Sequence, residues 1–174
     1  MKRTSVATLI LICVSVSAGS CWSRSLEVDA SQVAVIKPSA ESSDARLLVQ
    51  FTLPDILAAY SIDFACISFG ADCAGDEGRV SFQVFPVSRA WDPRTVSWAN
   101  PWDKAGGDWN ARLSAYEISE AGSGRTVELD VTDFANGWLK EPSKNFGLLA
   151  KVSGPFFGTF SLNEAQAPKL RVLY

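Results

Sequence analysis

The sequence predicts an all-β protein, a sandwich of two antiparallel sheets with one short helix. The first observation is an apolar period of two along most of the chain, the spacing of strands with one buried face. The second is regular punctuation by Gly, Pro, Asn and Asp, typical of short strands joined by turns. Hydrophobic residues make up 47% and charged residues 20%, as in ordinary globular chains. Each strand should therefore place one apolar row in a shared core and one polar row in water.

Taken in order, the apolar runs predict roughly nine short strands. The clearest alternation is that of Leu47, Val49, Phe51 and Leu53 with more polar neighbours. In the fifth run, Trp98 and Val96 should point the same way, which predicts that Trp98 belongs to the core. The predicted strands cover residues 26–36, 47–53, 61–69, 79–87, 94–98, 126–131, 146–152, 157–162 and 169–174.

One helix is predicted over residues 130–140. Asp130 or Thr132 is a suitable N-cap, and Phe134 and Trp138 are four residues apart on one face. Gly137 lowers the helix propensity, so two or three turns packed over a sandwich edge are expected.

The first twenty residues have the pattern of an export signal. Lys2 and Arg3 precede an apolar run at 6–16 that is too short to span a bilayer. The small residues before Cys21 resemble a bacterial lipobox, although ordinary signal peptidase could cut the same bond. We expect a signal peptide at 1–20, a lipidated or flexible spacer at 21–25 and one domain at 26–174. The exported protein would be lipid-anchored at the bacterial cell envelope, on the outer membrane if there are two, or secreted.

The cysteines support lipidation. Cys13 leaves with the signal, so Cys21, Cys66 and Cys73 remain, and an odd cysteine in an exported protein needs an explanation. If Cys21 carries lipid, Cys66 and Cys73 form an even pair in an oxidising compartment. The alternative is that Cys21 keeps a free thiol in a flexible tail.

Composition excludes several function classes. The chain has no histidine, which removes Ser–His and Cys–His nucleophile pairs and His-ligated zinc. A net charge of −3 gives no electrostatic signature of nucleic-acid binding, and no cofactor fingerprint is present. Two carboxylates would suffice for a glycosidase, but nothing in the sequence signals a deep cleft. We therefore expect a protein without catalytic activity and without a cofactor.

A loop at 101–112 has the best residues for ligand binding. Sugar rings present apolar faces that stack on aromatic planes, and polar rims that need carboxylate, amide or ammonium partners. The alternative is a long loop fastened to the body by its two tryptophans. The candidate ligand-binding residues are Trp102, Asp103, Lys104, Asp108, Trp109 and Arg112, with Asn110 as a further rim group.

Two further features are weaker. Asp72, Asp76 and Glu77 carry oxygen ligands suited to calcium, but they lack a fixed ligand spacing, so the metal remains an open alternative. The basic residues that would favour an anionic ligand are scattered along the chain, and exposed solvated positions are the simplest interpretation of them.

Several segments together resemble a DNRLRE domain. The opening strands correspond to RLLVQFTLP (46–54) and SIDFACISF (61–69). The most recognisable stretch is VSFQVFPV (80–87) followed by AWDPRTVSWANP (90–101). The family's short helix and last strands correspond to LDVTDFANGW (129–138), NFGLL (145–149), FSLNE (160–164) and PKLRV (168–172). The resemblance covers roughly residues 26–174; the first strand lacks the family's Asn and Gly pattern, and the segment between Cys66 and Cys73 has the character of a local addition.

The resemblance implies a jelly-roll sandwich of the kind found in exported microbial proteins, some of which bind acidic polysaccharide such as alginate. By this comparison Ala65, Ile67 and Phe69 point inward and Cys66 outward. Gly70 would then let the chain fold back and bring Cys73 to bonding distance of Cys66. The expected function is non-catalytic binding of extracellular or cell-wall polysaccharide. Anionic polysaccharides are among the expected ligands. The alternative is a structural or adhesion lipoprotein that binds a protein or matrix partner.

Overall fold

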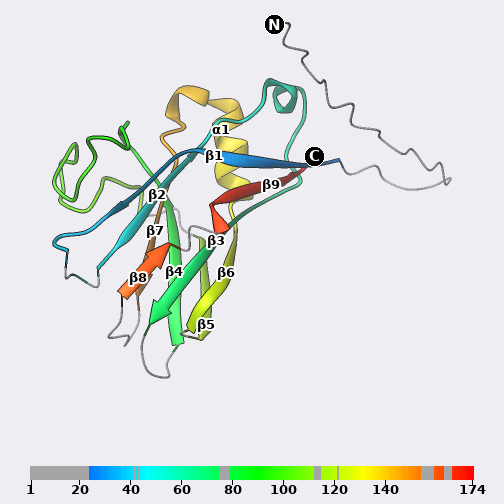
Figure 1. The fold of residues 1–174 in the computed structure, drawn as a ribbon. Coiled ribbons are helices and arrows are strands. Elements are labelled where there is room, and N and C mark those ends of the chain that lie inside the picture. The colour runs from blue at the N-terminus through cyan, green and yellow to red at the C-terminus, as the bar shows by residue number, and fades with distance from the viewer. Residues whose placement is uncertain are drawn as a thin grey trace, which may run out of the picture.

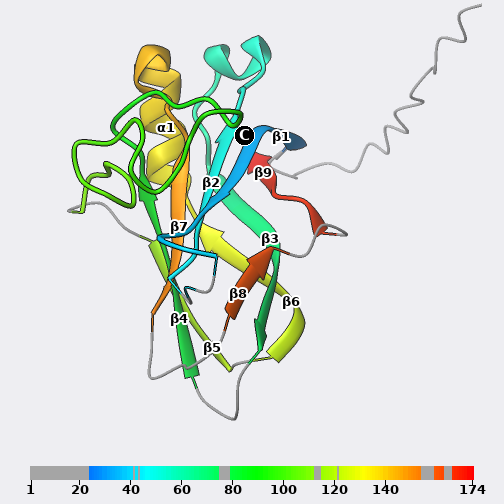
Figure 2. The same cartoon turned by 60° about the vertical axis from the view of Figure 1, so that its left-hand side comes forward.

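Two antiparallel sheets face each other in the computed structural model, which describes residues 24–40, 42, 44–74, 79–111, 115–120, 122–153, 159–162 and 166–174 (Figures 1 and 2). The strands are β1 (Ser25–Ile36), β2 (Arg46–Phe51), β3 (Phe64–Ala74), β4 (Arg79–Pro86), β5 (Ala115–Glu120), β6 (Gly122–Asp130), β7 (Leu148–Ser153), β8 (Thr159–Leu162) and β9 (Lys169–Leu173). The helix α1 spans Thr132–Lys140. The prediction of an all-β, jelly-roll-like sandwich with one short helix is confirmed.

Strand β1 belongs to both sheets. Its first part, Ser25 to Asp29, pairs with β9, and its second part, from Ala30 to Ile36, pairs with β2 across a register shift. A bulge of this kind bends a strand and lets it pass from one sheet to the other. One sheet therefore has the order β5-β4-β7-β2-β1, and the other has the order β1-β9-β3-β6, with β8 pairing the end of β3 that β9 does not reach.

The main core lies between the two sheets. Strand alternation sends Leu47, Val49 and Phe51 of β2 into it, opposite Ile67 and Phe69 of β3, as the sequence predicts. Helix α1 closes one end of this core with its apolar face, which contains Phe134 and Trp138 (Figure 2).

The start of α1 is held by side chains. Asp130 accepts hydrogen bonds from the backbone amide and the hydroxyl of Thr132, at 2.9 Å and 2.5 Å. The amide side chain of Asn136 pairs with the backbone of Ile62 in both directions, at 3.1 Å and 2.9 Å. These bonds fasten the helix to the segment that leads into β3, which confirms the predicted packing of the helix over a sandwich edge.

The predicted strand at 94–98 is wrong, and the strand Ala115–Glu120 was not predicted. Thr95 and Val96 have high β propensity, but their amides donate to the carbonyl of Asp92, at 3.0 Å and 2.8 Å, and form a turn. Asp92 also accepts from the backbone and the guanidinium of Arg94, so local bonds replace a sheet ladder.

The expectation of one polar row on every strand is also wrong in the sheet that contains β2 and β7. Leu48 and Leu149 point to the outer face of this sheet, and yet both are 0% exposed. They belong to a second apolar cluster, separate from the main core. This part of the outer face is dry because tryptophans of the loop 87–111 pack over it.

The predicted disulfide between Cys66 and Cys73 is wrong, because both residues lie on the single strand β3. The strand does not turn at Gly70 but continues to Ala74, paired with β6 as far as Cys73 across one register shift, and with β8 from Ala71 to Ala74. Seven residues of extended strand span about 23 Å, whereas a disulfide needs α-carbons within about 7 Å. Cys66 is accordingly a free thiol that is 4% exposed. Burial, with a further contribution from the nearby carboxylate of Glu128, raises the pKa of this thiol above its ordinary value.

We expect Cys66 to resist alkylation in the folded protein and to react fully in urea without a reductant. Burial blocks access, and the raised pKa lowers the thiolate fraction that reacts. Peptide mapping after iodoacetamide treatment, with and without urea, measures both states. A Cys66 peptide that stays unlabelled in urea until a reductant is added would contradict a free thiol.

Several predictions concern residues that the structure does not describe. The signal peptide at 1–20 and the lipidation site Cys21 precede the first described residue, and β1 begins at Ser25, inside the predicted spacer. In the described part of the chain, no helix combines the length and the apolar character needed to cross a membrane.

Candidate functional site

The loop 87–111 forms a layer of its own on the outer face of the sheet that contains β2, β4 and β7. In Figures 1 and 2 it is the long green loop beside α1, far from the C-terminal end of β3 and the start of β6. The sheet supplies apolar side chains that point away from the main core, and the loop supplies tryptophans. The buried members of this cluster are Ile36, Leu48, Phe85, Val87, Trp91, Trp102 and Leu149.

Trp91 and Trp102 fasten the loop to this face. The two residues are 8% and 7% exposed, respectively. The indole N–H of Trp91 donates to the carbonyl of Phe146 at 2.9 Å, and that of Trp102 donates to the carbonyl of Ser97 at 2.9 Å. Both residues are therefore apolar anchors with a satisfied polar atom. Trp102, predicted as a sugar-stacking residue, has no open ring face in this structure.

Arg46 of β2 lies between two tryptophans of the loop. Its guanidinium carbon is 4.3 Å from the ring centre of Trp98 and 5.0 Å from that of Trp109, within the range of cation–π attraction. The same group donates to the carbonyl of Gly106 at 2.7 Å and pairs with Asp44. We call Trp98, Arg46 and Trp109 the arginine stack. Trp98 is half-buried in this stack, and the prediction that it belongs to a strand facing the main core is wrong.

Gly106 and Gly107 let the loop approach this stack closely. Both have positive φ, at 92° and 113°. A β-carbon on Gly106 would lie 2.2 Å from the Arg46 Nη1 atom, and one on Gly107 would lie 2.6 Å from the Leu149 Cδ1 atom. Side chains are excluded here by both backbone conformation and space.

An ion-pair network organises the polar part of the loop. Arg89 pairs with Asp103 at 2.6 Å and with Asp108 at 3.3 Å, and it donates to the carbonyl of Pro101 at 2.7 Å. Asp108 in turn accepts from the backbone amides of Asp103 and Lys104, at 2.9 Å and 3.1 Å. The carboxylates of Asp103 and Asp108 thus hold the loop in shape. Lys104 is exposed and, within the described ranges, makes no ion pair.

These residues surround a depression of about 430 Å³, which we call the loop pocket. Four of the predicted binding residues, Asp103, Lys104, Asp108 and Trp109, line it, with Trp109 half-buried. Trp102 does not line it, and Arg112 lies outside the described residues. The full lining is Ser88, Arg89, Asp103, Lys104, Gly107, Asp108, Trp109 and Ala111.

Ser88 and Arg89 also line this site, although they are not among the residues that the sequence predicts. They enter it through a short antiparallel bridge between Val87 and Trp109, in which the amide of Ser88 donates to the carbonyl of Asp108 at 3.0 Å. Nothing near Ser88 in the sequence signals this pairing. In the sequence Arg89 is only one of many scattered cations, although Asp103 and Asp108 follow it in the same loop.

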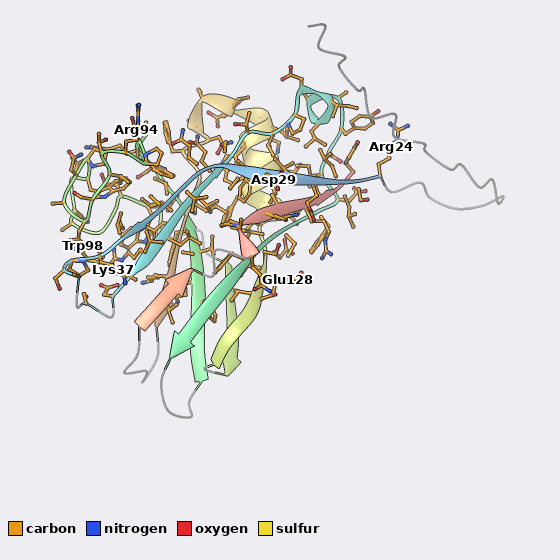
Figure 3. The ribbon with its side chains drawn as sticks, in the orientation of Figure 1. Arg24, Asp29, Lys37, Arg94, Trp98 and Glu128 are labelled. Carbon is orange, nitrogen blue, oxygen red and sulfur yellow. The ribbon has the colours of Figure 1, made fainter. Side chains whose placement is uncertain are left out.

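Asp92 and Arg94 form a separate exposed ion pair in the same loop; Figure 3 labels Arg94. Hydrogen bonds from the Arg94 guanidinium, and from its backbone amide, lower the pKa of Asp92 to about 2. Arg94 is therefore neutralised by its neighbour, and it adds no free positive charge to the loop.

The described residues contain no group of three or more His, Cys, Asp or Glu side chains arranged for a metal ion. The calcium candidates Asp76 and Glu77, and the side chain of Asp72, fall outside what the structure describes. No protein-family model matches this chain, and no curated protein matches it.

Proposed function

We propose that this protein is a non-catalytic, exported module that binds polysaccharide through the loop pocket. The observation that carries the proposal is the composition of that pocket. The half-buried indole of Trp109 lies beside the carboxylates of Asp103 and Asp108 and the exposed ammonium of Lys104. An aromatic plane bordered by hydrogen-bonding groups fits a sugar ring, which has an apolar face and a hydroxylated rim. A volume of about 430 Å³ lies within the usual range of small-ligand pockets.

The pocket is organised before any ligand arrives. Arg89, Asp103 and Asp108 fix one another, and Arg46 supports Trp109 from the sheet side. A rigid site loses little conformational freedom on binding, which favours affinity for weakly binding sugars. The resemblance to DNRLRE domains, some of which bind polysaccharide, also supports this proposal.

The proposal includes a lipid anchor at Cys21. The described chain begins at Arg24, and Figure 3 shows Arg24 and Trp98 at opposite ends of the molecule. A tether at the Arg24 end would therefore leave the loop 87–111 directed away from the membrane. Cys21→Ala should release the protein from the membrane fraction without changing its melting temperature. Continued sedimentation of this variant with membranes would mean that the anchor lies elsewhere.

A structural or adhesion role is the second candidate. It is favoured by Ile56 and Tyr60, two large side chains that are exposed in the same turn. The ring of Tyr60 packs on that of Tyr174 at a centroid distance of 5.1 Å, which extends the apolar surface. Ile56→Lys would weaken a protein contact at this surface and leave sugar binding unchanged.

We expect Trp109→Ala to weaken polysaccharide binding about tenfold. An aromatic stacking contact contributes about 0.5–1.5 kcal/mol beyond area burial, and about 1.4 kcal/mol corresponds to a factor of ten. A glycan array followed by affinity electrophoresis identifies the polysaccharide and measures the change. Lys104→Ala is a second test, since this exposed side chain lines the pocket without an ion pair to any described residue.

Trp98→Ala is the matched control for this prediction. Trp98 stacks on the same Arg46 and is also half-buried, but it does not line the loop pocket. It should lose a similar amount of stability and keep its affinity. Equal losses of affinity in the two tryptophan variants would show that loop integrity, and not contact with Trp109, controls binding.

A further inference from the structure

A second pocket of about 440 Å³ lies between α1 and the loop, and we call it the helix pocket. Its floor is apolar and aromatic, made by Val87, Phe134, Trp138 and Phe146. No motif in the sequence indicates this pocket, because its walls come from β4, the loop, α1 and the segment before β7. Figure 2 shows α1 and the green loop at the same end of the sandwich.

The helix pocket adjoins the loop pocket. Ser88 lines both of them, and the neighbouring residues Asn110 and Ala111 line one each. The short ribbon between them is held by two backbone bonds: Ser88 donates to Asp108 at 3.0 Å, and Asn110 donates to Pro86 at 3.1 Å. A ligand longer than one sugar can therefore pass over Ser88 and occupy both pockets.

The charges along this path do not suit an acidic ligand. In the helix pocket, Lys144 is paired with Glu141, and Asp133 adds a carboxylate that makes no ion pair with any described residue. In the loop pocket, Arg89 is shared between Asp103 and Asp108. Of the three cations that line the path, Arg89 and Lys144 are paired, and only Lys104 makes no ion pair with a described residue. Because four carboxylates line the same path, its net charge is negative, and an acidic polymer would meet like charge beside Asp133.

We propose that the two pockets form one groove for an uncharged glycan chain, with the helix pocket as its second sugar subsite. This inference rests on the proposed function of the loop pocket. An aromatic floor bordered by carboxylates and an ammonium provides hydrogen-bonding partners for neutral hydroxyl groups without requiring charge on the ligand. The chain would lie across the groove, so affinity should rise with the number of sugars until both pockets are filled.

Gly137 offers a way to close the helix pocket without disturbing the fold. It lies in the middle of α1 and lines this pocket, and a β-carbon there would meet no heavy atom within 4 Å. Gly137→Leu fills this space and also raises helix propensity. Lys140→Leu is the matched control, because Lys140 is exposed on the same helix and lines neither pocket.

The experiment measures affinity by isothermal titration for the wild type, Gly137→Leu, Lys140→Leu and Trp109→Ala. The probes are neutral β-1,4-glucan, β-1,3-glucan and β-1,4-mannan, as disaccharides and hexasaccharides, together with alginate and polygalacturonate hexasaccharides. Thermal melts verify that each variant is folded. We expect a neutral hexasaccharide to bind at least tenfold tighter than either acidic one. Gly137→Leu should weaken binding of the neutral hexasaccharide about tenfold and leave binding of the disaccharide unchanged. Lys140→Leu should bind both probes as the wild type does.

Each contrary result has a distinct meaning. If Gly137→Leu keeps full hexasaccharide affinity and Trp109→Ala loses it, the helix pocket is not a subsite and the proposed function stands. Tighter binding of alginate or polygalacturonate would overturn the assignment to an uncharged glycan. If the wild type binds none of the probes, both the inference and the proposed function fail.

Discussion

Replacing Trp102 with alanine is expected to lower the free energy of unfolding by about 3–5 kcal/mol, the usual cost of removing a large buried aromatic side chain. Trp102 is 7% exposed and packs in the cluster with Trp91, Leu48 and Leu149. The substitution leaves a cavity beneath the loop and removes the N–H donor to Ser97. Urea unfolding followed by tryptophan fluorescence measures the change.

Trp109→Ala provides the comparison for Trp102→Ala. Trp109 is only half-buried, so its removal should cost clearly less stability while lowering sugar affinity more directly. A loss of less than about 1 kcal/mol for Trp102→Ala would mean that the loop folds independently of this residue. In that case the layer of tryptophans would not be what holds the loop on the sheet.

Gly106→Ala should destabilise the protein by roughly 2–5 kcal/mol. A left-handed backbone costs a non-glycine residue about 1–2 kcal/mol, and overpacking adds about 1–3 kcal/mol. The new methyl group would be 2.2 Å from Arg46 Nη1 and 2.9 Å from the Trp98 ring, so the arginine stack must open. Thermal and urea unfolding measure the loss.

Gly124→Ala isolates the packing part of this effect. Gly124 also has a positive φ, of 65°, but a β-carbon there meets no heavy atom within 4 Å. It should therefore cost only about 1–2 kcal/mol. Equal effects of the two substitutions would show that the close approach of Gly106 to Arg46 contributes no stability.

Part of the candidate site was predictable because its residues are close together in sequence. Asp103, Lys104, Asp108 and Trp109 lie within one short loop, and a loop of this length brings its own side chains together around a pocket. The sequence could not tell which tryptophan stays accessible. Trp102 and Trp109 both have polar loop residues beside them in the sequence. Only the position of the sheet beneath them makes Trp102 a buried anchor and Trp109 a wall of the loop pocket.

Arg46 shows a second limit of local patterns. Its place between Trp98 and Trp109, and its bond to Gly106, join a strand to a loop some 60 residues later. The alternation of β2 predicts only that Arg46 is on the same side as Leu48, away from the main core. Whether that side is wet or covered depends on a segment that the pattern of β2 does not contain.

The sequence by itself determined the sandwich, its main core and the helix, because the periods of strand and helix are local properties of the chain. Leu47, Val49 and Phe51 alternate inward, and Phe134 and Trp138 share one helix face, wherever the rest of the chain lies. Tertiary structure alone decided the second apolar cluster, the free thiol of Cys66 and the helix pocket. Each of these depends on how far a strand continues or on which distant segment covers a face. Such outcomes follow from the burial free energy of the whole fold and leave no local period to detect.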